Sequence, residues 1–176
     1  MNFREVLGRQ ILFFDGGMGT LLQERGLKAG EVPETWNIVH PECIRQIHKE
    51  YLMAGSNIIS ANTFGVNAFK CKNLPYTVDE LVTAGIQLVQ EAIQEVRSSS
   101  NGGEKQPMYA ALDIGSIGKL LKPLGEISFD EAYKTFQEII IAGDKAGADL
   151  ILIETVSDSY EIKACLLYTS DAADDM

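Results

Sequence analysis

Short apolar runs alternate with longer amphipathic stretches along this chain. Each short run is bounded by polar or glycine residues, which is typical of a buried strand. In the stretches between them, apolar residues recur at intervals of three and four, the spacing of one helix face. The predicted strands are 11–14, 58–59, 108–112 and 150–153, and the predicted helices are 41–54, 78–96, 128–146 and a fourth that begins near Asp158.

Local signals predict where several of these elements end. Pro41 suits the first turn of a helix and Gly55 suits the residue after its last turn. Ser128 and Glu131 have the spacing of a capping box, so a helix should begin there. The Ser- and Gly-rich stretch 98–106 predicts a polar loop.

Strands that alternate with helices favour parallel βαβ units with both faces of the sheet covered. The connections that follow strands are long (15–41 and 113–128), whereas the turns that lead into strands are short (55–57 and 147–149). This asymmetry is typical of barrels, which build their sites from the long loops. We therefore predict an α/β fold, the N-terminal half (about four βα units) of a (β/α)8 TIM barrel. A doubly wound open sheet is the alternative.

The composition of the chain argues against several kinds of partner and predicts a cellular location. The 176 residues include 15 basic and 25 acidic ones, for a net charge of −10, which argues against a nucleic-acid partner and gives no attraction to an anionic membrane. No apolar run approaches the roughly 20 residues of a membrane span. Three widely spaced cysteines predict no disulfide framework, and hence a cytoplasmic protein.

Polar side chains follow each predicted strand at the same end. They are Asp15, Asn62 with Thr63, Asp113 and Glu154. Because parallel strands end at one edge, these groups should converge there, where carboxylates can bind the ammonium group of an amino acid. The alternative is that each is a helix cap or turn residue.

Two glycine-rich turns add to the candidate chemistry. The turn 15–20 predicts close approach of backbone to a ligand, and lacks the third glycine of a dinucleotide fingerprint. The segment 115–120 faintly matches a phosphate loop, but Leu120 stands where Ser or Thr would be needed. An open-sheet phosphate-binding enzyme is therefore a further, less supported hypothesis.

Together these motifs resemble the homocysteine S-methyltransferase family. The matching stretches are DGGMGTLLQERGL, PETWNIVHPE, HKEYLMAGSNIISANTFGVNAFK and AGADLILIETVSDSYEIKA, while ALDIGSIGKLLKPLGEISFDEAY is similar to the cobalamin-dependent methionine synthase branch, in its N-terminal homocysteine-binding domain. The resemblance implies a (β/α)8 barrel that transfers a methyl group to the sulfur of homocysteine. The donor is methylcobalamin, recharged from methyltetrahydrofolate on other domains, or betaine in another branch.

The resemblance also implies roles for residues of this chain. Asp15 and Glu154 would bind the substrate ammonium group. The amino-acid end of the site would be lined by Gly16, Gly17, Thr63 and Phe64, with Asn62 and Asp113 as additional candidates.

The family activates the homocysteine thiol with zinc held by three cysteines, in an Asn-Cys motif and a Gly-Gly-Cys-Cys pair. Neither motif occurs here, so we expect no metal ligand and no catalytic residue in this chain. We divide it into a partial homocysteine-binding domain, 1–166, and an acidic tail outside the family pattern, 167–176, as in a truncated reading frame. Such a fragment should be poorly soluble and inactive without the methyl-donor domains of its parent protein. A non-catalytic α/β protein for small-molecule binding or assembly is the alternative.

Overall fold

The computed structural model describes residues 3–99 and 106–174, and the side chains as far as residue 168. Most of the predicted loop 98–106 lies outside the described residues, and Ser98 and Ser99 belong to a helix. In chain order the elements are α1 (Phe3–Val6), α2 (Met18–Glu24), η1 (Pro33–Thr35), α3 (Trp36–Val39), α4 (Pro41–Ala54), β1 (Ile58–Ser60), α5 (Ala68–Cys71), α6 (Val78–Ser99), β2 (Tyr109–Ile114), α7 (Phe129–Ala146), β3 (Leu150–Ile153) and α8 (Ser159–Asp174).

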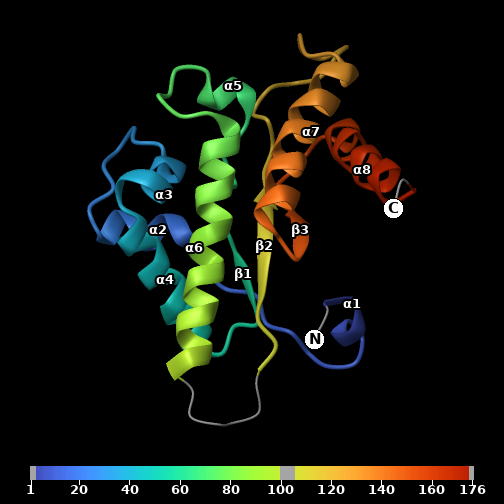
Figure 1. The fold of residues 1–176 in the computed structure, drawn as a ribbon. Helices are drawn as coiled ribbons and strands as arrows, with labels where there is room; N and C mark the ends of the chain where they lie inside the picture. Colours follow the sequence, from blue (N-terminus) through green and yellow to red (C-terminus); the bar gives the residue numbers. More distant parts are fainter. Residues whose placement is uncertain (1–2, 100–105, 175–176) are drawn as a thin grey trace.

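The three strands form a parallel sheet in the order β1–β2–β3. Helix α6 packs against α4 on one side and α7 on the other, and α8 packs against α7 (Figure 1). This mixed α/β architecture with a parallel sheet confirms the prediction from strand–helix alternation.

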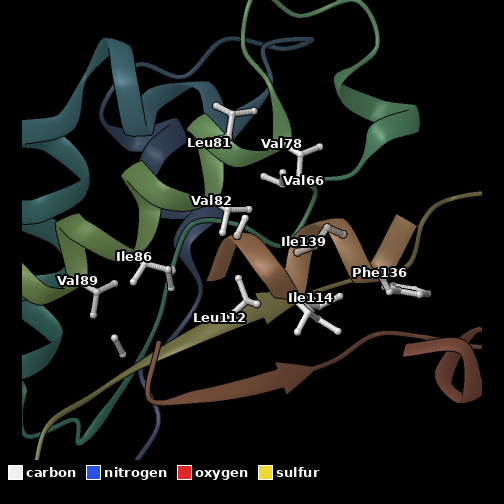
Figure 2. Packing of buried hydrophobic residues seen from close by; sticks show 14 of the residues in the cluster. Val66, Val78, Leu81, Val82, Ile86, Val89, Leu112, Ile114, Phe136 and Ile139 are labelled. Atoms are coloured by element: carbon white, nitrogen blue, oxygen red, sulfur yellow. The ribbon is translucent and has the colours of Figure 1, made fainter. Parts of the chain in front are cut away.

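The two faces of β2 pack against different parts of the protein. Ala110, Leu112 and Ile114 alternate along the strand and join the large core under α6 and α7 (Figure 2). The intervening Tyr109 and Ala111 point to the opposite face, where Val6 of α1 covers them. Asp113 belongs to this second face by the same alternation, so its carboxylate is directed away from the helices.

Local signals placed the helix ends correctly. Helix α4 begins at Pro41 and ends at Gly55, whose φ of 110° is the left-handed conformation that glycine adopts without strain. Ser128 and Glu131 form both hydrogen bonds of the capping box that begins α7. Helix α8 continues to Asp174, through most of the stretch predicted as an acidic tail.

The prediction of a strand at 11–14 is wrong. Only Phe14 forms a parallel bridge, with Ile58. The N–H of Phe13 donates to the Asn57 side chain instead of to a backbone carbonyl, which interrupts the ladder. Ile11 and Phe13 are 79% and 61% exposed, because no described strand lies on the outer side of this segment.

In the part of the chain that the structure describes, no helix combines the length and the apolar composition needed to cross a membrane.

Candidate functional site

A cavity of about 620 Å³ lies at the carboxyl ends of the strands, where parallel sheets place their sites. Seven of the eight residues predicted from sequence line it: Asp15, Gly16, Gly17, Asn62, Phe64, Asp113 and Glu154. Thr63 does not. The apolar part of the lining consists of Phe14, Met18, Leu152, Pro33 and Ala61.

The turn that carries Asp15 is tethered from two elements. The N–H of Asp15 donates to the Ile58 carbonyl at 3.0 Å, and the N–H of Ser60 donates to the Asp15 carboxylate at 3.0 Å. From α4, the Tyr51 hydroxyl donates to the Gly17 carbonyl at 3.0 Å. A Cβ at Gly16 would lie 2.8 Å from the Tyr51 hydroxyl oxygen, so the close packing requires glycine.

Burial raises the pKa of Asp15 to about 6. The negative charge of Glu154 also raises this pKa, whereas the hydrogen bond from Ser60 lowers it. Burial raises the pKa of Asp113 further, to about 7, with contributions from Glu154, Asp15 and Glu34. The Asp113 side chain is only 7% exposed, and its Oδ1 has no hydrogen-bond partner among the described residues. A buried oxygen of this kind is costly unless a ligand supplies a donor.

The side chains of Asn62 and Thr63 form hydrogen bonds between the segments around the cavity. The Thr63 hydroxyl donates to the Asp113 carbonyl at 2.8 Å, and the N–H of Asp113 donates back to it at 3.2 Å. The Asn62 side chain donates to the Pro33 carbonyl and to the Asn37 side chain, both at 2.9 Å. Their polar atoms therefore connect β1 and β2 to the 33–37 segment.

Glu154 and Phe64 are exposed lining residues of the cavity. Glu154 is exposed, and the next residue, Thr155, has a φ of 53°, which is strained for a β-branched side chain. Phe64 is 37% exposed, and its ring lies so close to Gly115 that a Cβ there would be 2.5 Å from the ring.

Sequence reasoning missed Glu34 and Ser60, which also line the cavity. Glu34 is 6% exposed and accepts the Gly65 N–H at 2.6 Å. Its position in the long connection after the first predicted strand was the one available signal, because such loops form the sites of parallel folds.

The described residues do not fit the zinc that the family resemblance implies. They contain no group of three His, Cys, Asp or Glu side chains that could hold a metal ion. Cys43 is half-buried against the core around α2 and α4, Cys71 is buried at the end of α5, and Cys165 is buried on α8. We therefore derive no chemical step through zinc in this chain.

The segment 115–118 is not a free phosphate cradle. The N–H of Ile117 donates to Glu161, and the N–H of Gly118 donates to the Ser116 hydroxyl. The N–H of Gly115 donates to the Phe64 carbonyl. These groups are therefore satisfied inside the protein, which argues against the phosphate-binding hypothesis.

Comparison with known proteins identifies the family of this chain. The homocysteine S-methyltransferase family model matches residues 12–174, and the chain belongs to that family. It is 26% identical over 175 residues to the methionine synthase of Mycobacterium leprae (strain TN), a match that covers 93% of this chain and 14% of that protein.

The solved structures show the same fold. The homocysteine methyltransferase MmuM from Escherichia coli matches with a TM-score of 0.81 and 19% identity in its metallated form, and 0.83 and 20% in its oxidized form. In both cases the match covers 97% of this chain and 62% of the MmuM chain. The chain thus spans less than two thirds of these proteins.

Proposed function

We propose that this chain is the homocysteine-binding part of a homocysteine S-methyltransferase of the methionine synthase type. It binds the amino-acid end of homocysteine in the cavity at the strand ends. Asp15, Glu154 and Asp113 receive the ammonium group, and Gly16, Gly17 and Phe64 line the remainder. Asn62 and Thr63 maintain the walls between them.

One observation carries this proposal: the buried Oδ1 of Asp113, which has no hydrogen-bond partner among the described residues, lies in a cavity that Asp15 and Glu154 also line. The mutual repulsion of these groups, together with burial, raises the pKa of Asp113. A ligand ammonium group would donate a hydrogen bond and compensate the repulsion at once. The apolar wall with Phe64 suits the carbon chain that follows.

We further propose that this chain, with its three strands and the Phe14 bridge beside β1, forms the first half of a (β/α)8 barrel. The parallel sheet, the site at the strand ends and the 62% share of MmuM support this. The remaining units, with the cysteine ligands for zinc, would then belong to the rest of a longer parent protein. The part of the parent's domain in this chain would include at least residues 12–174, which the family model matches.

In such a parent protein, the bound thiol would be methylated from methylcobalamin, which methyltetrahydrofolate recharges on another domain. The resemblance of 111–133 to the cobalamin branch supports this donor over betaine. The chain's own residues bind and orient homocysteine. We do not expect methyl transfer by this chain alone, and we propose a cytoplasmic location.

Calorimetric titration of the full chain with L-homocysteine tests the proposal. We expect binding without added zinc, and a loss of at least tenfold in affinity for the analogue that lacks the amino group, 4-mercaptobutanoate. Asp15→Asn should lose a similar factor for homocysteine and little for the analogue, because the lost attraction is to the ammonium group. Asp79→Asn, an exposed carboxylate at the start of α6, is the matched control.

Two results would contradict this function. Equal affinity for homocysteine and its deamino analogue would show that the carboxylates do not bind the ammonium group. Absence of binding in a chain that unfolds cooperatively would leave the alternative of an assembly protein, which size-exclusion chromatography with and without homocysteine would then examine.

A further inference from the structure

Glu161 is a buried carboxylate that the site described above does not use. It lies in the first turn of α8 and is 2% exposed. Among the described residues it forms no ion pair, and its oxygens accept from the Ile117 N–H at 2.5 Å and the Ser116 hydroxyl at 3.2 Å. A carboxylate is stable in such a place only while these donors stay where they are. Glu161 therefore sets the position of the segment that follows β2.

That segment is tethered at each residue. The Ser116 hydroxyl accepts from the Gly118 N–H at 3.0 Å, and the Ser116 carbonyl accepts from the Lys70 ammonium group at 3.0 Å. The N–H of Gly115 donates to the Phe64 carbonyl at 3.1 Å. The segment consequently links α8 to the residues after β1.

Phe64 depends on this segment for its orientation. Its ring packs directly on Gly115, where a Cβ would come within 2.5 Å of the ring. The Lys70 ammonium group lies 5.9 Å from the ring centroid. Since Phe64 lines the cavity, a shift of Gly115 would move part of the cavity wall.

We propose that Glu161 is a positioning residue of the candidate site: it holds the segment 115–118, and that segment holds the Phe64 ring against the carbon chain of the bound amino acid. The inference rests on the proposed function for the identity of the ligand. It does not need that function for the coupling between Glu161 and Phe64.

Titration of the full chain with L-homocysteine tests the coupling in three variants. Glu161→Ala should weaken binding about tenfold. Glu161→Gln should stay within about threefold of the wild type, because its amide can accept from Ile117 and donate to the Ser116 oxygen. Glu138→Ala, which removes an exposed carboxylate on the neighbouring helix α7, should change nothing.

A double-mutant cycle separates positioning from general stability. In a Phe64→Ala background, Glu161→Ala should cost less than twofold in affinity, because the ring it positions is gone. A full tenfold loss in both backgrounds would overturn the proposal. Where Glu161→Ala does not fold, Ser116→Ala removes one of the two hydrogen bonds to Glu161 together with the one that Gly118 donates to Ser116, and we expect a threefold loss in affinity that disappears without Phe64. Unchanged affinity in Ser116→Ala would overturn the proposal.

A second readout needs no ligand. In NMR spectra of the full chain, Glu161→Ala or Ser116→Ala should shift the Phe64 ring signals and speed the exchange of the Ile117 amide, whereas Glu161→Gln should not. If the wild-type protein does not bind homocysteine, the proposed function is wrong. The spectra still test whether Glu161 positions the Phe64 ring, because they need no ligand. Unchanged ring signals in both disruptive variants would overturn the inference.

Discussion

The hydroxyl of Tyr51 lies 3.0 Å from the carbonyl oxygen of Gly17, so a helix outside the cavity holds the turn that carries Asp15. The other tethers of this turn act at or before Asp15, through Ser60, Ile58 and Ser56. Tyr51 therefore restrains the Gly17 end of the turn, which these other hydrogen bonds do not reach.

Tyr51→Phe should weaken homocysteine binding about three- to tenfold, the equivalent of one hydrogen bond of about 0.5–1.5 kcal/mol. The free energy of unfolding should fall by less than about 1 kcal/mol, because water can reach the carbonyl in the variant. Calorimetric titration and urea denaturation measure the two quantities. Tyr160→Phe, at an exposed position, is the control. A loss of stability with unchanged affinity would contradict the role in binding.

Asp113→Asn should stabilise the free protein at the cost of binding. The folded-state pKa of about 7 lies above the ordinary 3.8, so ionisation of Asp113 favours the unfolded chain as pH rises through this interval. At pH 8 we expect the variant to be more stable by about 1–4 kcal/mol, and at pH 3.5 the difference should vanish. Urea denaturation at both pH values measures this. A difference that does not change with pH would refute it.

Homocysteine binding should strengthen as pH rises from 5 to about 7.5. Asp15 and Asp113 have pKa values of about 6 and 7, so both are partly protonated in the free site, and only their ionised forms attract an ammonium group fully. Binding should therefore release protons, by an amount that calorimetry in buffers of different ionisation enthalpy reveals. Equal affinity at pH 5.5 and 7.5 would count against this arrangement of charges.

His48 should make the fold sensitive to acid. It is fully buried on α4, neither ring nitrogen has a described partner, and burial lowers its pKa from 6.5 to about 3. Protonation is thus easier in the unfolded chain, so stability falls by about 1.4 kcal/mol per pH unit as pH drops from 6.5 toward 3. Asp15 and Asp113 act in the opposite direction.

The comparison of wild type with His48→Leu isolates the histidine contribution. The variant should lose this acid-dependent slope in urea denaturation. His40→Gln, at an exposed position, should keep it. Parallel pH profiles for His48→Leu and the wild type would show that His48 does not cause the slope.

Thr155 stores strain beside Glu154. Its φ of 53° should make Thr155→Gly more stable by about 0.5–1 kcal/mol, since the left-handed region costs glycine nothing. Thr155→Asn should gain part of this, because asparagine tolerates that region. Both variants should bind homocysteine two- to threefold more weakly, because Glu154 is then less well oriented. Thermal denaturation measures the first effect, and destabilisation in both variants would contradict it.

The start and end of α4 and the start of α7 were predictable because their signals are local. Pro41, Gly55 and the Ser128–Glu131 capping box act on backbone groups within one turn, so they determine helix ends wherever the helix packs. The segment 11–14 was not predictable in this way. Its apolar composition suits a strand, but a strand exists only where neighbours complete the ladder, and here only Phe14 pairs.

The candidate site was predictable where it follows from strand direction. Asp15, Asp113 and Glu154 come at or near the carboxyl ends of parallel segments, so any such sheet brings them to one edge. Glu34 and Tyr51 come from the helical segments before β1, and no periodicity in the sequence connects them to that edge. Glu161 reaches the cavity wall only through Ser116, Ile117 and Phe64.

The sequence by itself determined the three strands of the parallel sheet, the four long helices and the meeting of the acidic residues, because these depend on patterns that repeat along the chain. Only the tertiary structure decided that Asp113 is buried, with an oxygen that none of the described residues contacts through a hydrogen bond, and that its pKa rises to about 7. Burial and charge repulsion are sums over neighbours distant in sequence, so they exist only after β1, β2 and the connections around them have packed together.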